Sequence, residues 1–590
     1  MQRWQTYGAR DTPLKSEGDA AFVGIDMTRD RGALPPGMIA RGENNRMREG
    51  NCRVRPGNIL PGEFQAPFIA PFLGSAIYSN PNGNEVMLVA DSGGDYVWQL
   101  RAGQVWKKIL FEPGVDLVGD SVEFCQAFEK VLLMRKPIPG GATTNLVWDG
   151  NEANTFDYIT MSTFFGGGTL TPATWNAEPF KNRVLLYNAR DPTVPWRDQI
   201  QMSDVLDYSQ CDDILGKFRI NAAESDIITR VWGYYQGAVV VFKARSLHLL
   251  SNFTVDPFFA VQNMLTRRLG LACNKGVTED GHDLLFISEP GGIYRLSEVI
   301  QEQIATEARP VSDPIQPIVD RINWEGTAQW GCAQTIKDYA YFGVCLDDVT
   351  DGCNALLVLN LATRQWESAP DVFGDQTLRL NALHVTKAEH GLALYGLDYT
   401  AAKIYHLFGG NDTDEVGDVD LPIVHTIETR GYTLGVPDEF KRFDRAAVAV
   451  ATSNPNAELA AITDGAYEVK VIKTITKDRT RFYPQASPDY IAGFSDAVAP
   501  YRKDYSVVPD TDPNFVGEDF DDLDAGAIDE LPATPVPAVP VSIKQQSVEP
   551  LPVRANGRWL SIRSVNSTGT CDILSVGVEG RSIRARQVAA

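Results

Sequence analysis

The sequence predicts an all-β protein: a β-propeller of about six or seven blades, with an N-terminal arm and a C-terminal β-sandwich-like domain. Short apolar runs rich in Val, Ile and Leu recur in pairs along most of the chain, and turn-forming residues separate the two members of each pair. Helical periodicity is almost absent. The best helical candidate is Ser297 to Thr306, where Val299, Ile300 and Ile304 alternate with polar residues.

The composition is that of a folded, acidic protein. The 590 residues exceed what one ordinary core supports, so two or more domains, or one large repeat domain with appendages, are expected. The net charge is −22. Residues 1–57 hold 10 basic and 7 acidic residues, which leaves 44 basic against 69 acidic residues elsewhere, a net charge of −25. Such a body repels phosphate, which excludes a broad nucleic-acid-binding face.

The cysteines and the hydropathy indicate a cytoplasmic site of synthesis. Eight cysteines are scattered without a CxxC pair, so reduced and mostly buried thiols are predicted. No basic segment followed by a short apolar one opens the chain, and no apolar run has the length of a membrane span. We therefore expect a protein that is made and folded in a cytoplasm and has no membrane-spanning segment.

The predicted N-terminal arm, residues 1–60, carries an unusual stretch from Phe22 to Gly57. Pro35 and Pro36 precede Gly37, and this order predicts a tight turn, because proline presets φ and glycine tolerates a positive φ.

A hairpin is predicted next. Asn45 to Arg48 and Cys52 to Arg55 alternate on either side of a Glu-Gly-Asn turn. Met47, Cys52 and Val54 are expected to share one face of this hairpin. The opposite face would carry arginines, which together with the two prolines are the predicted assembly residues: Arg46, Arg48, Arg53, Arg55, Pro35 and Pro36. The alternative is an ordinary surface hairpin.

Residues 61–410 are predicted to form the propeller. An apolar segment interrupted by prolines, Phe64 to Tyr78, enters it, and the paired runs then repeat at roughly 45 to 65 residues, as propeller blades do. A two-sheet sandwich with long insertions is the alternative. The pairs are Val86–Val89 with Tyr96–Leu100, Val131–Met134 with Leu146–Trp148, Val184–Tyr187 with Gln199–Met202, Ala238–Phe242 with Leu247–Leu250, Leu284–Ile287 with Ile293–Leu296, Tyr339–Val344 with Leu356–Leu359, and Leu392–Tyr395 with Ile404–Leu407.

Two further regions are predicted to close the chain. Residues 411–531 are expected to form a β-rich domain with an acidic insertion, and residues 532–590 a Pro-rich linker with closing strands. The strands expected in these regions are Lys441–Val450, Glu468–Ile475, Trp559–Val565 and Cys571–Val578.

The order FxGI, RD, LPPG and an Asn-Arg-rich run that ends in RVRPG, all within residues 22–57, resembles the N-terminal signature of a known family. The family is that of the tail nozzle proteins of short-tailed bacteriophages, also called tail tubular protein B or tail stabilisation protein. Residues 182–208, 237–250 and 281–296 resemble blades of that family. Residues 440–450 and 557–578 resemble its C-terminal β domain.

The resemblance implies a structural virion protein that is not an enzyme and has no cofactor. It implies a homo-oligomeric ring, a hexamer, at the distal end of the tail, through which phage DNA exits into the host without specific binding. The implied partners are a tail adaptor protein and tail fibres or spikes. The protein would be assembled in the host cytoplasm and reside in the virion tail. The acidic runs at residues 412–420 and 518–530 are candidates for lumen or tip loops, because negative charge keeps passing DNA from sticking.

No sequence motif points to a catalytic or metal site. A phosphate-binding loop, a nucleophile elbow and a zinc-binding helix are all missing from the sequence, and its six histidines are mostly far apart. A glycosidase brings two carboxylates together in space without a fixed spacing. The alternative function is therefore a glycan-binding or glycan-cleaving propeller of a virion or cell surface. Its candidate sugar-stacking residues are Trp98, Trp106, Trp148 and Trp196.

Overall fold

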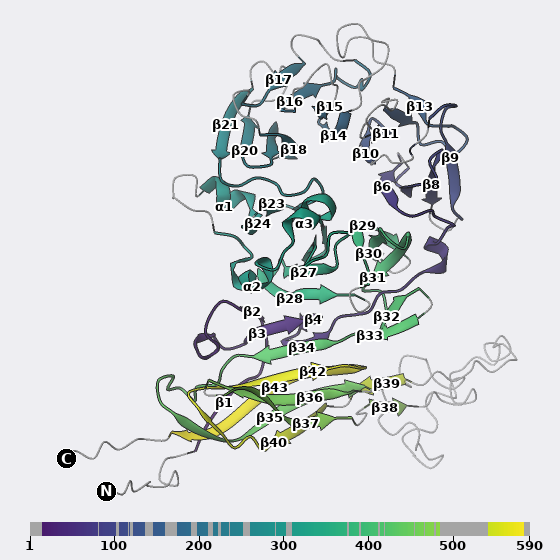
Figure 1. Cartoon of the computed structure of the whole chain (residues 1–590). Helices are drawn as coiled ribbons and strands as arrows, with labels where there is room; N and C mark the ends of the chain where they lie inside the picture. Colours follow the sequence, from purple (N-terminus) through teal and green to yellow (C-terminus); the bar gives the residue numbers. More distant parts are fainter. Residues whose placement is uncertain are drawn as a thin grey trace, which may run out of the picture.

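Figure 1 shows two parts of the molecule: a ring of seven small β-sheets and, below it, two larger sheets. The computed structural model describes residues 14–483 and 541–582, apart from residues 81, 102–104, 116, 118–121, 136–144, 160–173, 190–196, 211–215, 222–225, 235–236, 252–259, 290, 302–308, 374–376, 389–390, 411–412, 418, 454, 465, 477–479 and 545. Three short helices lie near the fifth and sixth sheets: α1 (Leu296–Gln301), α2 (Gln316–Val319) and α3 (Trp324–Trp330). The first falls in the segment where a helix was predicted.

Each small sheet is antiparallel and consists of consecutive strands. The seven paired runs predicted from the sequence are the second and third strands of the successive sheets, so the predicted repeat is confirmed. The first four sheets are β6 (Phe72–Ser79), β7 (Glu85–Asp91), β8 (Tyr96–Arg101), β9 (Lys107–Leu110); β10 (Val122–Ala127), β11 (Lys130–Arg135), β12 (Leu146–Trp148), β13 (Asp157–Tyr158); β14 (Thr174–Phe180), β15 (Arg183–Ala189), β16 (Gln199–Met202), β17 (Lys217–Arg219); and β18 (Ile228–Tyr234), β19 (Ala238–Lys243), β20 (Leu247–Ser251), β21 (Val261–Thr266). The last three are β22 (Val277–Glu279), β23 (Leu284–Ser288), β24 (Gly292–Arg295); β25 (Cys332–Ile336), β26 (Tyr339–Val344), β27 (Ala355–Asn360), β28 (Gln365–Val372); and β29 (Leu380–Ala388), β30 (Gly391–Asp398), β31 (Lys403–Leu407).

The ring closes on itself. The first strand of the last sheet, β29, lies beside β6 of the first, and Ser75 and His384 share a hydrogen bond of 2.7 Å across this contact. A second closure lies on β31, the third strand of the last sheet, where Ile59 and His406 exchange backbone hydrogen bonds of 3.0 and 2.9 Å. The segment that leads into the first blade is thus paired with the last blade. The sheets are the blades of a seven-bladed propeller, and the sandwich alternative does not apply to this part of the chain.

The lower part consists of two sheets that share one core. The first contains β4 (Asn45–Arg48), β5 (Asn51–Val54), β43 (Thr570–Ser582), β35 (Lys441–Ser453) and β40 (Gln546–Leu551), with β1 (Lys15–Asp19) and β41 (Ala555–Gly557) paired to it. The second contains β2 (Gly24–Ile25), β3 (Met38–Glu43), β34 (His425–Thr429), β42 (Leu560–Asn566), β36 (Ala457–Thr463) and β37 (Ala466–Ile475). Two hairpins stand apart: β32 (Thr413–Val416) with β33 (Val419–Pro422), and β38 (Thr480–Tyr483) with β39 (Val541–Lys544).

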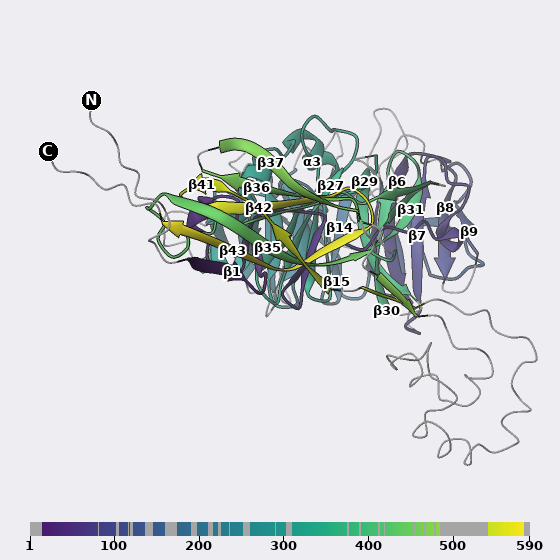
Figure 2. The ribbon, with the colours of Figure 1, turned by 90° about the horizontal axis from the view of Figure 1, so that it is seen from below.

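This β domain draws its strands from both ends of the chain. Seen from below in Figure 2, the long strands β35, β42 and β43 cross beneath the propeller. β35 pairs along most of its length with β43, although 116 residues lie between them. The predicted boundary between residues 411–531 and 532–590 therefore separates strands that share the same two sheets.

The predicted N-terminal arm is not separate either. Residues 15–54 supply strands to both sheets of the β domain. The reason is that their polar groups find partners far along the chain: Arg430 donates to Asp19 at 2.9 and 3.2 Å, and the backbone N–H of Gly37 donates to the same carboxylate at 3.2 Å. Gly37 has a φ of +82°, as the predicted turn requires, while Pro35 and Pro36 are exposed.

The predicted hairpin forms, with Met47 opposite Cys52 and Arg46 opposite Arg53. Its faces are as predicted, but its first strand packs against β28, the outer strand of the sixth blade. The backbone N–H of Met47 donates to the Glu367 carboxylate at 3.1 Å, and the Asn45 amide donates to the Glu367 carbonyl at 3.2 Å. The hairpin therefore joins the β domain to the propeller.

Two arginines of the hairpin region are buried in ion pairs across this junction. Arg46 is 3% exposed, and its Nη1 and Nη2 lie 3.1 and 2.5 Å from the two carboxylate oxygens of Asp371. Arg55 is 1% exposed and binds both oxygens of Asp414, at 2.8 and 2.5 Å. Such two-point pairs fix the orientation of both partners.

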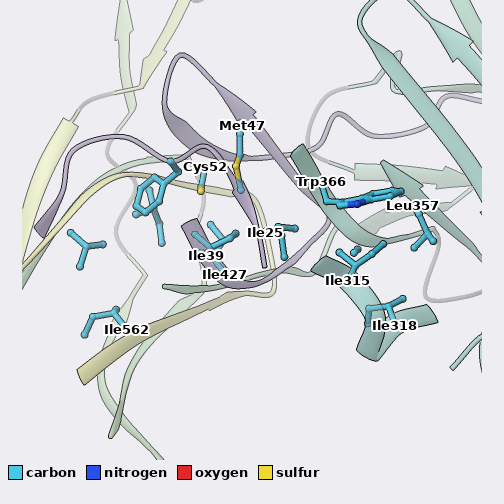
Figure 3. Close-up of a cluster of buried hydrophobic side chains, with 14 of the residues drawn as sticks. Ile25, Ile39, Met47, Cys52, Ile315, Ile318, Leu357, Trp366, Ile427 and Ile562 are labelled. Atoms are coloured by element: carbon cyan, nitrogen blue, oxygen red, sulfur yellow. The ribbon is translucent and has the colours of Figure 1, made fainter. Parts of the chain in front are cut away.

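A single hydrophobic core runs through the junction (Figure 3). Trp366 of β28 and Leu357 of β27 come from the sixth blade, Ile39 and Ile427 come from the β domain, and all four side chains are buried. The Trp366 indole donates to the Val311 carbonyl at 2.9 Å. Because buried apolar area is the main source of stability, the blade and the β domain stabilise each other.

We expect Arg46→Ala to lower the free energy of unfolding by about 3–5 kcal/mol, because it leaves the Asp371 carboxylate buried without its cation. Arg53→Ala is the matched control, since Arg53 lies directly opposite Arg46 but pairs with the exposed Glu49. Its expected cost is within about 1 kcal/mol. Urea unfolding followed by tryptophan fluorescence measures both. Equal losses in the two variants would contradict the structural role given to Arg46.

Candidate functional site

A cavity of about 460 Å³ lies at the centre of the propeller. Residues from the first strand of every blade line it, and Figure 1 shows several of these strands, β6, β10, β14, β18 and β29, around the middle of the ring. Successive side chains of a strand point to opposite faces. Along a first strand, residues that face this space therefore alternate with residues that face the next blade. The size is that of small-molecule sites, about 300–1,000 Å³.

Glu178 of β14 and Arg230 of β18 form the charged pair of the third and fourth blades. Their side chains are largely buried, and the Arg230 Nη2 lies 3.8 Å from a Glu178 carboxylate oxygen. Burial raises the pKa of Glu178 to about 7, although Arg230 acts in the opposite direction. Nearby Glu123 adds to the increase. Glu178 is therefore poised to gain or lose a proton near neutral pH.

Glu123 of β10 is the second carboxylate of the cavity. Burial raises its pKa, while Lys275, Arg230 and a hydrogen bond from the Asn274 amide lower it. Asn274 reaches it from the loop before the fifth blade, and its carbonyl accepts a hydrogen bond of 2.9 Å from Arg230. Glu123 and Glu178 thus share Arg230, which holds the two carboxylates in one network.

The lining also contains a second cation, Lys275, and the uncharged side chains of His384 and Trp232. Lys275 donates to the Asn381 carbonyl at 3.3 Å. Burial, with the help of Lys275, lowers the pKa of His384 to about 3, so the imidazole is neutral at physiological pH. Trp232 lines the cavity from β18, and the Arg230 guanidinium lies 4.5 Å from its ring centroid. The site therefore combines two carboxylates and two cations with the aromatic side chains Phe124, Tyr187 and Trp232.

Sequence reasoning did not find this site. It recognised the second and third strands of the blades, which are the most apolar, and not the first strands. The missed signal is a single charged residue within an otherwise uncharged first strand, such as Glu123 in VEFCQA, Glu178 in TWNAEPF and Arg230 in ITRVWGY. Each charge is unremarkable alone, and only the ring places the three together.

The predicted assembly residues fall into two groups. Arg46 and Arg55 are buried in the junction within the chain. Arg48 is exposed, Arg53 is partly exposed, and Pro35 and Pro36 are exposed. These four remain available for contacts with another molecule.

The tryptophans proposed to stack on sugars mostly lie elsewhere. Trp148 is fully buried, and Trp98 is 5% exposed and donates to Asp91 at 2.9 Å. Trp106 packs partly buried against the same cluster as Trp98, and Trp196 lies outside the described residues. The first three are core side chains of the first two blades.

Two residues of the first acidic run contact the N-terminal part of the chain: Asp414 binds Arg55, and the Glu415 carboxylate accepts from the Leu60 backbone N–H at 2.8 Å. In the run at residues 412–420, Asp414 is buried against Arg55 and so does not face solvent. The run at residues 518–530 lies outside the described residues.

Metal, thiol and membrane features are known for the residues that the structure describes. There, no three His, Cys, Asp or Glu side chains are grouped so that they could hold a metal ion. The seven cysteines in that part of the chain are buried, and no disulfide links any two of them; Cys211 falls in one of the gaps. Within the same ranges, no helix has the length and apolar character to cross a membrane.

Comparisons with known proteins return structures alone. No family model matches the sequence, and no curated protein matches it. Similar solved structures include YCF48 from Cyanidioschyzon merolae, at 10% identity and a TM-score of 0.36, with 58% of this chain and 97% of that chain covered. Virginiamycin B lyase from Staphylococcus aureus matches at 9% identity and a TM-score of 0.35, covering 59% and 97%. An exo-β-1,3-galactanase from Phanerochaete chrysosporium matches at 9% and 0.24, covering 86% and 99%. None of the three is described as a phage tail component, and these identities and TM-scores are too low to transfer a function.

The raised pKa of Glu178 predicts a pH dependence of stability. Between the ordinary pKa of about 4.5 and the folded value of about 7, the native state binds more protons than the unfolded state, so this group's contribution to stability is lost as the pH rises. Glu178→Gln removes the effect. Its melting temperature relative to the wild type should therefore be higher at about pH 8 than at about pH 5. Glu289→Gln, on an exposed turn of the fifth blade, is the control and should show no such trend. A pH-independent difference for Glu178→Gln would contradict the raised pKa.

Proposed function

We propose that the chain is a structural virion protein, a subunit of the distal tail nozzle ring through which phage DNA leaves the particle. One observation supports it above the others: the stretch that resembles the nozzle signature, residues 22–57, is the part that fixes the β domain to the propeller. The arginines of that stretch, Arg46 and Arg55, are the buried cations of the junction.

The rest of the fold agrees with the same resemblance. Residues 182–208, 237–250 and 281–296, which resemble blades of the family, contain strands of the third, fourth and fifth blades. Residues 440–450 and 557–578, which resemble its C-terminal β domain, contain β35, β42 and β43 of the β domain. A ring that transmits force during DNA ejection needs subunits whose parts do not move independently, and a shared core provides this.

The proposal extends to the assembly. Arg48 and Arg53 carry the positive charge that the hairpin leaves at least partly exposed. A neighbouring copy of the chain has the opposite sign, with a net charge of −22. We place these two residues at a contact with a second copy of the chain or with the tail adaptor. A hexameric ring, contacts with tail fibres or spikes and passage of DNA without specific binding follow from the same resemblance.

The location of the protein on virions tests the proposal. An antibody raised against the purified protein should label the free end of a short tail in electron micrographs, and purified tails should show it as a ring. The double variant Arg48→Glu with Arg53→Glu should reduce its incorporation into particles, while the control Arg364→Glu, on an exposed turn of the sixth blade, should not. A protein absent from virions, or located on the head, would overturn the proposal.

A second candidate function is a propeller that binds or cleaves a glycan. The cavity favours it, because two carboxylates, two cations and aromatic side chains face a space of ligand size. A cleaving enzyme would release reducing ends from a polysaccharide, and a binding protein would not. A Glu178→Gln variant that loses such release would assign catalysis to this cavity.

A further inference from the structure

The charges in the propeller cavity balance when both of its carboxylates are ionised. Among the side chains that line it, Glu123 and Glu178 oppose Arg230 and Lys275. A phosphate or sulfate group entering the cavity would meet two carboxylates, and a metal ion would meet two fixed cations. Burying a charged ligand here would therefore be costly without a third, uncompensated charge to receive it.

The cavity also has hydrogen-bonding capacity that the protein does not use. The Nε of Arg230 is buried and has no partner, and its Nη2 is too far from Glu178, at 3.8 Å, for a hydrogen bond. Lys275 has three donors, and the contact described for it is a single carbonyl at 3.3 Å. A buried donor that lacks a partner costs free energy, so a ligand that accepts from it gains affinity.

An uncharged ligand with several hydroxyl groups matches these features. Each hydroxyl both donates and accepts, so it can accept from Arg230 or Lys275 and donate to Glu123 or Glu178. A purely apolar ligand would leave the buried Nε of Arg230 without an acceptor. Trp232 adds an aromatic surface at the wall, which suits the C–H face of a sugar ring.

We propose that the central cavity of the propeller binds a small uncharged polyhydroxylated ligand, a single sugar unit, against the network of Glu123, Glu178, Arg230 and Lys275. The proposal names the ligand class for the second candidate function and rests on it. It does not depend on the tail assignment, which the location on virions decides separately.

Saturation-transfer NMR tests the proposal with four probes used one at a time: glucose, galactose, mannose and N-acetylglucosamine at millimolar concentration. At least one probe should receive saturation from the wild-type protein. Glu178→Gln and Lys275→Met should each weaken its binding about tenfold or more, because each removes a charge-assisted hydrogen bond. Glu289→Gln, far from the cavity, should bind as the wild type does.

A further cavity variant distinguishes loss of binding from loss of folding. Gln334 lines the cavity, and its amide donates to the carbonyl of its neighbour Thr335 at 3.3 Å, so Gln334→Ala should fold normally and weaken binding. The melting temperature of each variant is compared with that of the wild type. If none of the four probes binds, or if the cavity variants bind as well as Glu289→Gln, the proposal is wrong.

Discussion

The arrangement of this protein depends on two buried ion pairs of its N-terminal hairpin region: Arg46 pairs with Asp371 of the sixth blade, and Arg55 pairs with Asp414 of the hairpin β32–β33 that follows the last blade. Removing charges from water is costly, and a buried pair often contributes little net stability. Each pair fixes the relative orientation of its two side chains, because the carboxylate contacts the guanidinium at two points. We infer that the hydrophobic core supplies the stability at this junction, while the two pairs select one docking geometry.

Chain connectivity reinforces this junction. The segment after the hairpin pairs with the last blade through Ile59 and His406, and the chain then enters the first blade. After the last blade it returns to the β domain through β34, which lies between β3 and β42. The propeller is therefore held at both of its ends by the same β domain. The ring of blades closes through the pairing of Ile59 with His406 and through the contact between β6 and β29.

The sequence predicted local features well and distant contacts poorly. The middle strands of the blades are continuous apolar runs between turn residues, so their positions were evident, while the number of blades was predicted only as about six or seven. The hairpin faces followed from alternation. The partner of Arg46 lies 325 residues away and that of Arg55 lies 359 residues away, and one sequence does not indicate which acidic residue meets which arginine. The arginines were therefore interpreted as surface residues. The cavity was missed for the same reason, since its four charged residues come from three different blades and from the loop before the fifth blade.

Native-state hydrogen exchange tests most directly whether the propeller and the β domain are one cooperative unit. If the shared core and the two ion pairs join them, the slowest amides of β28 in the sixth blade and of β35 and β43 in the β domain should open with the same free energy. That free energy should respond equally to added denaturant at all three strands. A β domain whose amides exchange through a separate, lower-energy opening, while β28 stays protected, would contradict this account.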